Sequence, residues 1–334
     1  MYLLNGNTPD EIEETTFAEL GKKESDIEEL LRKNINMICD DAESMLTVGQ
    51  QVKNAENGRS DLTAIDNDGN IVLIEIKRDK KDIGHRKEAF EFQAIRYAAS
   101  CATIKDTDEL VQDIFAPYVE KHKNEFSSYG DSLTSTEIAQ RVLKDFIDTN
   151  GIKDFNEKQR IILVASEFDP QTLSAVAWLN SNQVDIACYQ ITPYKFDDSI
   201  IIDMKKVLPV PEYSDFFVDV VNQKVLVQGQ KKSITRKNLP KIDALMKYHV
   251  ILSGALFKAK DRDSEAVLQD DGQVKIKDSG QVTSLQQWLK GVYGWSSVET
   301  YALTVDVQSG KTLSELRAAY MEKNQELPEV DFNL

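Results

Sequence analysis

Residues 59–80, RSDLTAIDNDGNIVLIEIKRDK, contain the feature that most restricts how this chain can fold. A short strand that begins with polar residues enters a tight turn, and a strongly apolar strand leaves it. Because side chains alternate between the two faces of a strand, Leu73, Glu75 and Lys77 share one face and the apolar residues between them share the other. A strand with the composition of a buried one therefore ends with a carboxylate and an ammonium on the same face.

The length of the turn decides whether Asp61 can reach this charged pair. A two-residue Asp-Gly loop would place Asp61 opposite Ile76, on the wrong face of the hairpin. A three-residue loop at 67–69, with its glycine in the left-handed conformation, places Asp61 opposite Glu75 instead. The sequence has a glycine at the position where the longer loop needs it. We therefore expect Asp61, Glu75 and Lys77 to converge.

Two carboxylates beside one lysine form an oxygen-rich site suited to Mg²⁺ or Mn²⁺. Such a metal polarises a phosphoryl oxygen and lowers the pKa of a bound water, while the lysine orients that water or stabilises developing charge. Paired carboxylates also serve glycosidases, but that mechanism has no role for an adjacent lysine. A structural alternative, with Glu75 and Lys77 as a surface pair and Asp61 as a turn residue, is equally open from the spacing alone.

The residues around this motif resemble the PD-(D/E)XK nuclease superfamily. Ser60-Asp61 stands for the family's Pro-Asp pair, without its proline, and Glu75-Ile76-Lys77 is the intact E-x-K element. The resemblance implies a restriction-endonuclease-like α/β fold over residues 1–205, with a mixed central sheet flanked by helices. It also implies that Asp61 and Glu75 bind the metal, with the Ile76 carbonyl as a further ligand, and that Lys77 activates or orients the water.

Two more elements of the family lie on flanking helices. The resemblance implies one further acid upstream, which within ESDIEELL is best assigned to Glu28, with Glu24 or Glu29 less favoured. Downstream, FQAIRYAA matches the Q-x-x-x-Y helix of several branches of the family through Gln93 and Tyr97. In those branches the glutamine approaches the metal site, where it positions the water or the lysine, and the tyrosine contacts the substrate backbone.

The remaining patterns of the first 205 residues alternate between helix and strand. Helical periodicity predicts helices at 23–41, 85–104, 107–123, 136–149 and 170–182, and continuous apolar runs predict strands at 159–166 and 184–194. Ser25 is the expected cap of the first helix, with Glu28 three residues later. This order is typical of an α/β sandwich with a mixed central sheet.

The chain changes character after residue 205. Residues 206–235 are expected to form a linker and a hairpin, and residues 236–325 a smaller α+β domain with a hairpin centred on 270–273. Helices are predicted at 238–251, 284–294 and 312–324. No internal repeat is found.

The second domain resembles the RAMA domain, a module associated with restriction enzymes and adenine methylation. The matching features are Asp271-Gly272 in the hairpin, Thr283-Ser284 before a helix, Gly294-Trp295, and the closing LSELRAAY. The chain departs from the family pattern at residues 286–288, and Tyr301 stands where the family has a tryptophan. The resemblance implies a module that positions or reads DNA, including modified DNA, while Trp288, Trp295 and Tyr301 are expected to be core residues.

The net charge of −16 argues against a protein that binds nucleic acid generically, but local clusters of basic residues remain. Two clusters are the candidates for phosphate contact, one just past the apolar strand and one near the domain boundary. Their members are Lys80, Lys81 and Arg86, and Lys231, Lys232, Arg236 and Lys237. The alternative for the first cluster is an ordinary solvated loop.

Other protein classes are disfavoured by composition. No window approaches the roughly 20 apolar residues of a membrane span, and the acidic first residues lack the order of a signal peptide. Three cysteines and three scattered histidines provide neither a disulfide framework nor a structural zinc site. A reducing, cytoplasmic setting is therefore the expectation.

The leading hypothesis is a Mg²⁺-dependent (or Mn²⁺-dependent) deoxyribonuclease in restriction, defence or repair, with a C-terminal DNA-positioning domain. A non-cleaving nucleic-acid-binding protein that keeps the nuclease fold is the main alternative, and the complete Asp-Glu-Lys set argues against it. A metal-independent assembly protein with a fortuitous motif is the third. Nothing in the sequence separates DNA from RNA, or endonuclease from exonuclease action. Because many relatives pair to cut both strands, a homodimer is expected.

Overall fold

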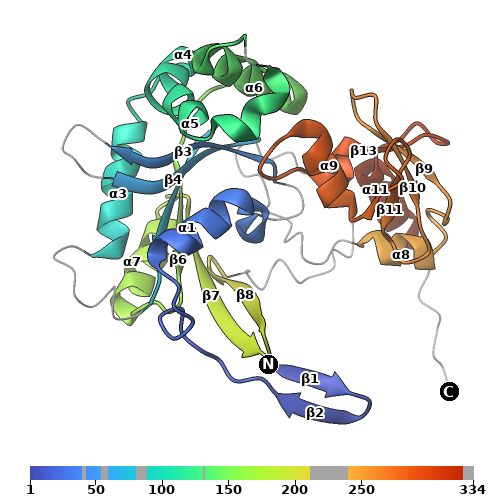
Figure 1. The fold of residues 1–334 in the computed structure, drawn as a ribbon, viewed down its shortest axis with the longest axis horizontal. Coiled ribbons are helices and arrows are strands. Elements are labelled where there is room, and N and C mark those ends of the chain that lie inside the picture. Colours follow the sequence, from blue (N-terminus) through green and yellow to red (C-terminus); the bar gives the residue numbers. More distant parts are fainter. Residues whose placement is uncertain (40–42, 54–58, 80–88, 131, 211–239, 326–334) are drawn as a thin grey trace. The chain divides into compact units, whose positions relative to one another are not determined.

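The computed structural model describes residues 1–39, 43–53, 59–79, 89–130, 132–210 and 240–325 (Figure 1). The chain forms two compact units. The first comprises Met1–Ile38 and Met45–Val210, and the second comprises Cys39–Ser44 and Pro211–Leu334.

A six-stranded mixed sheet is the centre of the first unit. Its strands, in spatial and chain order, are β3 (Met45–Lys53), β4 (Arg59–Asp66), β5 (Ile71–Lys77), β6 (Arg160–Ala165), β7 (Ile186–Phe196) and β8 (Ser199–Leu208). The pairs from β3 to β5 are antiparallel, those from β5 to β7 are parallel, and β7 pairs antiparallel with β8. The predicted mixed α/β architecture is confirmed at this level.

Helices cover the sheet, and two of them begin close to the end of β5. The helical segments among the described residues of the first unit are α1 (Glu24–Lys33), η1 (Ile35–Ile38), α3 (Phe90–Cys101), α4 (Thr107–Leu110), the π-helical turn η2 (Val111–Phe115), α5 (Ala116–Lys121), η3 (Lys123–Tyr129), α6 (Ser135–Asn150) and α7 (Pro170–Ser181). Helix α1 packs on β4 and β5, α3 packs on β4, β5 and β6, and α7 packs on β7 and β8. Every residue of β5 and β6 is buried, and for their apolar residues this was predicted.

The β4–β5 turn has the predicted three-residue form. Gly69 adopts φ 86°, and the Asp66 amide donates to the Asn70 carbonyl at 3.1 Å. The ladder pairs Leu62 with Ile74 and Ile65 with Ile71, so the next pair toward the charged end is Asp61 with Glu75. The register predicted from the glycine position is confirmed.

Several predictions differ from the structure at element boundaries. Helix α1 begins at Glu24, so Ser25 is inside the helix and its prediction as the cap is wrong; the Lys23 amide instead donates to Asp26 Oδ2 at 2.7 Å. The helix predicted at 23–41 is divided into α1 and η1. Four pieces of the first unit had no predicted helix or strand, namely η3, β3, β8 and an N-terminal hairpin of β1 (Tyr2–Asn5) and β2 (Thr8–Glu11).

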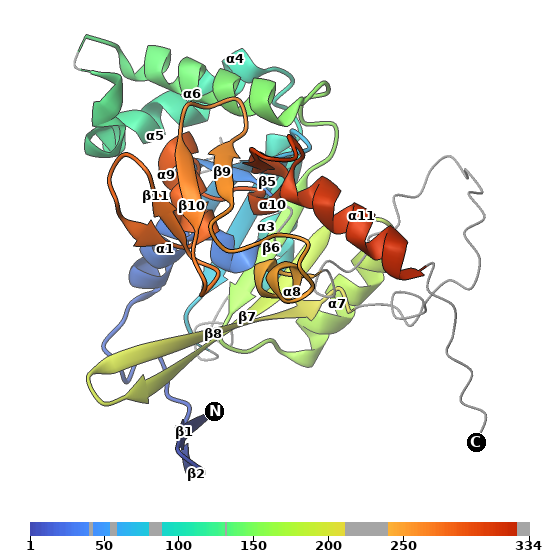
Figure 2. The same ribbon diagram turned by 90° about the vertical axis from the view of Figure 1, so that its right-hand side faces the viewer.

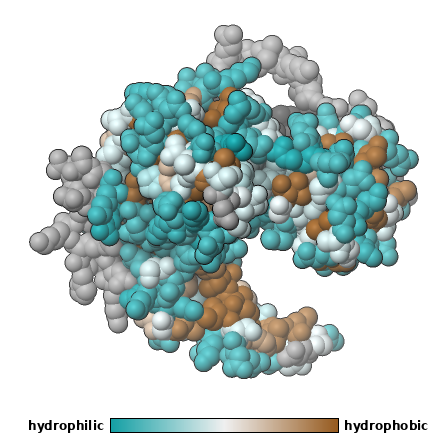
Figure 3. Space-filling view, turned by 45° about the horizontal axis from the view of Figure 1, so that its top comes forward, coloured by the Kyte–Doolittle hydropathy of each residue, from teal (hydrophilic) through white to brown (hydrophobic). Residues whose placement is uncertain are grey.

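Strand β8 occupies residues that were partly assigned to the linker, because it continues to Leu208. It is an edge strand of the sheet, and its turn end exposes Ile200 (42%). In the face shown in Figure 3, apolar side chains gather over the β7–β8 hairpin within a mainly hydrophilic surface. Lys205 and Lys206 lie at the other end of β8, where charge discourages further strand pairing.

The second unit is a five-stranded antiparallel sheet with helices (Figure 2). The strand order is β12 (Val282–Thr283), β11 (Val274–Ile276), β10 (Glu265–Leu268), β9 (Leu256–Ala259) and β13 (Thr304–Asp306). The helices are α8 (Ile242–Lys247), α9 (Leu285–Tyr293), α10 (Thr300–Leu303) and α11 (Leu313–Gln325). The predicted hairpin at 270–273 is the β10–β11 turn, and Trp288, Trp295 and Tyr301 are buried as predicted.

The hairpin and most of the linker predicted within residues 206–235 lie outside the described residues. Among the described helices, none is long and apolar enough to cross a bilayer.

Candidate active site

The site begins with two carboxylates on neighbouring strands. Asp61 is near the start of β4 and Glu75 near the end of β5, and the hairpin register sets them opposite each other. Asp61 Oδ2 accepts a hydrogen bond from the Ile76 amide at 2.7 Å, which fixes the carboxylate against β5. Both side chains are buried, Glu75 completely. The alternative in which Asp61 is a simple turn residue does not fit this arrangement.

The Lys77 ammonium lies between three carboxylates. Its Nζ is 3.7 Å from Glu24 Oε1, 3.7 Å from Asp61 Oδ2 and 3.8 Å from Glu75 Oε2. It also donates to the Ile76 carbonyl at 2.6 Å. Lys77 is only 1% exposed, so the alternative in which Glu75 and Lys77 form a surface pair does not fit. A buried ammonium is tolerated only with such compensation, because its desolvation is otherwise very costly.

An aromatic ring completes the surroundings of this ammonium. The Phe90 ring, at the first residue of α3, has its centroid 5.2 Å from Lys77 Nζ. This distance allows a cation–π contact, which a desolvated ammonium strengthens. The N-terminal ends of α1 and α3 therefore both contribute side chains next to the end of β5.

The three candidate glutamates of α1 have different surroundings. Glu24 is the one beside Lys77. Glu28 is buried and reaches the site through Gln51, whose amide donates to Glu28 Oε2 at 2.5 Å and to Asp61 Oδ1 at 3.2 Å. Glu29 instead pairs with Arg32, at 2.7 Å from its Nε.

The carboxyl groups of Glu28 and Glu29 differ in their pKa values accordingly. Burial raises the pKa of Glu28, and the hydrogen bond from Gln51 acts in the opposite direction. The hydrogen bond from Arg32 lowers the pKa of Glu29 to about 2. Glu28 is thus the acid of α1 that the protein desolvates, while Glu29 belongs to a structural ion pair.

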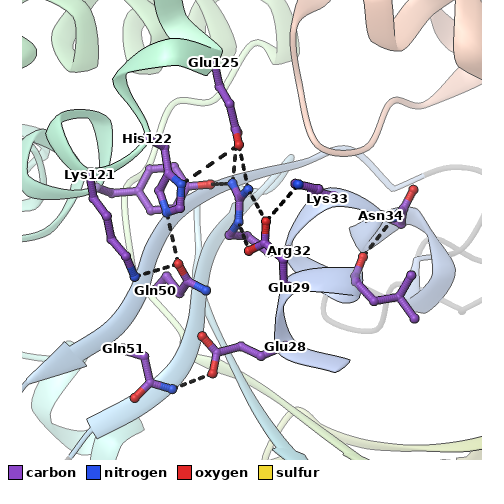
Figure 4. A network of polar contacts seen from close by, with 12 residues as sticks. Glu28, Glu29, Arg32, Lys33, Asn34, Gln50, Gln51, Lys121, His122 and Glu125 are labelled. Atoms are coloured by element: carbon purple, nitrogen blue, oxygen red, sulfur yellow. Dashed lines mark hydrogen bonds and ion pairs between the residues drawn. The ribbon is translucent and has the colours of Figure 1, made fainter. Parts of the chain in front are cut away.

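A buried arginine holds α1 in place beside the site (Figure 4). Arg32 is 3% exposed and donates to Glu29, to the Tyr118 hydroxyl at 2.8 Å and to Glu125 at 2.7 Å. Next to it, Gln50 Oε1 accepts from Lys121 Nζ at 2.7 Å and lies 3.0 Å from His122 Nε2. These contacts join α1, β3, α5 and η3, so the network fixes α1 against the elements that surround the candidate site.

Gln93 and Tyr97 lie together on α3. The Gln93 amide donates to the Tyr97 hydroxyl at 3.3 Å, and the Arg59 backbone amide donates to the same hydroxyl at 2.9 Å. Tyr97 therefore joins α3 to the first residue of β4, two residues before Asp61. The clusters predicted to contact phosphates, Lys80, Lys81 and Arg86 and then Lys231, Lys232, Arg236 and Lys237, lie outside the described residues.

The oxygen donors present fit a hard divalent cation. Among the described residues, no three His, Cys, Asp or Glu side chains form a ready-made metal cluster. Mg²⁺, however, commonly takes only one or two carboxylates, with waters and substrate phosphates completing its shell. Asp61 and Glu75 supply two carboxylates and Ile76 a carbonyl. That carbonyl accepts from the Lys77 ammonium, and its oxygen has a second lone pair for a further partner.

Comparison with known proteins adds no family to this description. No protein-family model, no curated protein and no solved structure matches the chain.

Proposed function

We propose that this chain is a divalent-metal-dependent nuclease that hydrolyses DNA phosphodiester bonds. In this proposal the first unit is a restriction-endonuclease-like domain of the PD-(D/E)XK type, and the second is a RAMA-like domain that positions or reads DNA. The protein acts in restriction, defence or repair.

One observation carries the proposal. Asp61 and Glu75 face each other across the β4–β5 hairpin, and both lie within 4 Å of a Lys77 ammonium that is buried with them. Folding has no need to bury this many charges together, since apolar residues of similar volume are often as stable. Closely packed buried charges occur at functional sites, where burial and neighbouring charges are arranged to suit the chemistry.

The side chains have distinct roles in the proposed reaction. Asp61, Glu75 and the Ile76 carbonyl hold the Mg²⁺ or Mn²⁺ ion, which when bound polarises the scissile phosphate and lowers the pKa of a coordinated water. Lys77 orients the attacking water and stabilises the negative charge that develops on the phosphate. Glu28 adds a ligand or a second-metal contact, Glu24 increases the negative charge around the cation, and Gln93 positions the water or Lys77.

The substrate contacts follow from the same proposal. Tyr97 approaches the sugar-phosphate backbone, and the basic residues of the two clusters named above neutralise phosphates. Such contacts make binding strongly salt-dependent. The overall charge of −16 opposes adventitious binding elsewhere on the surface. A homodimer would allow both strands of a duplex to be cut.

The test is cleavage of supercoiled, linear, single-stranded and adenine-methylated DNA, and of RNA, with Mg²⁺, Mn²⁺ or a chelator. We expect wild-type protein to cut DNA only with metal, and Glu75→Gln to lose cleavage. Glu157→Gln, at an exposed glutamate of the same unit, is the matched control and should cut like wild type. Circular dichroism checks that each variant is folded.

The outcomes distinguish the proposal from its alternatives. Cleavage of RNA alone would retain the chemistry and change the substrate. Salt-sensitive binding of DNA without cleavage of any form would favour the non-cleaving protein that keeps the fold. Cleavage by Glu75→Gln at the wild-type rate would contradict the proposed site.

A further inference from the structure

Gln51 of β3 has an unusual backbone for a strand residue. Its φ is 55°, in the left-handed region that residues with a side chain seldom adopt. Non-glycine residues in this region persist only where the surrounding structure imposes them, and they gather at functional sites. Glycine would adopt this conformation without strain, but the chain has a glutamine at this position. The contacts of the Gln51 side chain therefore offer an explanation for this strained backbone.

An irregularity in β3 brings Gln51 to its position. The β3–β4 register shifts between Thr47 and Gly49, after which Gln50 pairs with Leu62 and Val52 with Ser60. Gln51 therefore lies across from Asp61. Without the shift, Gln50 would have this place, because the register before it pairs Thr47 with Ala64. The bulge thus decides which glutamine faces the site.

The side-chain amide of Gln51 connects two acids from different elements. It donates to Asp61 Oδ1 at 3.2 Å and to Glu28 Oε2 at 2.5 Å. The other oxygen of Asp61, Oδ2, accepts from the Ile76 amide. With one oxygen held from β3 and the other from β5, the Asp61 carboxylate has a single orientation. An amide with two N–H groups is suited to bridge two carboxylates without adding charge.

We propose that Gln51 is a positioning residue that orients Asp61 and Glu28 for binding of the divalent cation. This inference rests on the proposed function and adds a residue that no motif indicates. Gln51 contacts neither the cation nor the substrate in this account. It acts through Asp61, as the hydrogen-bonding partners of metal ligands do in other proteins, where their loss weakens metal binding or activity by about 10–100-fold.

Two variants separate the amide from the backbone. Gln51→Met retains the length of the side chain and the left-handed conformation but removes the N–H donors. Gln51→Gly removes the donors and also relieves the left-handed strain. The matched control is Gln183→Gly, because Gln183 has φ 67° in an exposed turn after α7, away from the site. A purely structural effect of glycine would appear equally in the control.

The measurements are Mn²⁺ binding without DNA by electron paramagnetic resonance, the Mg²⁺ concentration for half-maximal cleavage, and the thermal midpoint. We expect both Gln51 variants to weaken Mn²⁺ binding and raise the Mg²⁺ requirement by about 10–100-fold. The thermal midpoints show whether both variants fold cooperatively. Gln183→Gly should match wild type in both metal measurements.

Three results would overturn the inference. Wild-type Mn²⁺ affinity in the Gln51 variants would overturn it and leave the nuclease proposal intact, provided that the wild type cuts DNA. Lost cleavage with unchanged Mn²⁺ affinity would also overturn it, because Gln51 would then act on something other than the metal ligands. A wild-type protein that neither binds Mn²⁺ nor cuts any nucleic acid would overturn both proposals.

Discussion

Strand β4 buries an aspartate at each of its ends, and the two are held in different ways. Asp66, at the turn, accepts hydrogen bonds on Oδ1 from the amides of Asp68 at 3.1 Å and Asn70 at 2.9 Å. Asp61, at the other end, has partners on two neighbouring strands, namely the Gln51 side chain and the Ile76 amide with the Lys77 ammonium. The comparison shows that local turn contacts hold the first aspartate, whereas contacts from neighbouring strands hold the second.

The largest predicted effect is at Lys77. Lys77→Met removes the ammonium from between Glu24, Asp61 and Glu75, and we expect the free energy of unfolding to fall by about 3–5 kcal/mol, as when one partner of a buried ion pair is removed. Urea denaturation followed by circular dichroism measures this. Adding Glu75→Gln should restore part of the loss, because it removes one of the unpaired charges. A double variant no more stable than the single one would contradict the role of Lys77 as counter-ion.

The next effect is a pH dependence of stability caused by Asp66, beside the β4–β5 turn. Burial raises the pKa of Asp66 to about 6, against the opposing hydrogen bond from the Asn70 amide. Between about pH 4 and pH 6 the unfolded chain releases this proton while the folded chain keeps it, so stability falls as pH rises. Asp66→Asn lacks this titration. Its stability relative to wild type should therefore increase from pH 4 to pH 7, by up to about 3 kcal/mol. Denaturation midpoints at both pH values test this, and a constant difference would contradict it.

A smaller loss of stability is expected from a change at Asn156, whose side chain connects the start of β5 to the segment after α3. Its Oδ1 accepts from the Ile71 amide at 3.2 Å, and its Nδ2 donates to the carbonyls of Cys101 and Ile104, each at 2.9 Å. Asn156→Ala removes these bonds within a buried position, at a cost of about 2 kcal/mol. Thermal unfolding should record the loss, while the cleavage rate per folded molecule stays at the wild-type value. A selective loss of cleavage would mean that the turn end is also part of the site.

The smallest effect is expected at Lys33, a lysine of the same unit in an exposed ion pair. Its Nζ is 3.0 Å from Glu29 Oε1, and its side chain is 58% exposed. Lys33→Met should change the free energy of unfolding by less than about 0.5 kcal/mol, because exposed pairs contribute little. Urea denaturation beside Lys77→Met makes the comparison. Equal losses of unfolding free energy in Lys33→Met and Lys77→Met would show that burial does not determine how much Lys77 contributes to stability.

The sequence predicts the turn end well because the relevant signals are local. The glycine at position 69 fixes the loop length, and strand alternation then fixes the Asp61–Glu75 register. The position of Gln51 is not predictable in this way, because it depends on β3, which has no strong strand pattern, and on a register shift within it. The same is true of Glu24. Its place beside Lys77 depends on where α1 starts and how it packs on β5.

Burial of the charged residues also could not be read from the sequence. The pattern of β5 makes Lys77 a strand-end residue, which is normally solvated. Its 1% exposure results from α1, which is distant in sequence, and from Phe90 at the start of α3, which follows β5 after a loop. Local patterns therefore gave the motif, and tertiary packing gave its environment.

The most direct test compares the two aspartates of β4. Asp61→Asn and Asp66→Asn are the same isosteric change in one strand, and the readout is the Mg²⁺-dependent rate of DNA cleavage by each folded variant. The account predicts that Asp61→Asn reduces the rate by more than about 100-fold, because a metal ligand is lost, while Asp66→Asn cuts at the wild-type rate. Equal rates in the two variants, with the wild type active, would contradict the claim that Asp61 belongs to a catalytic metal site.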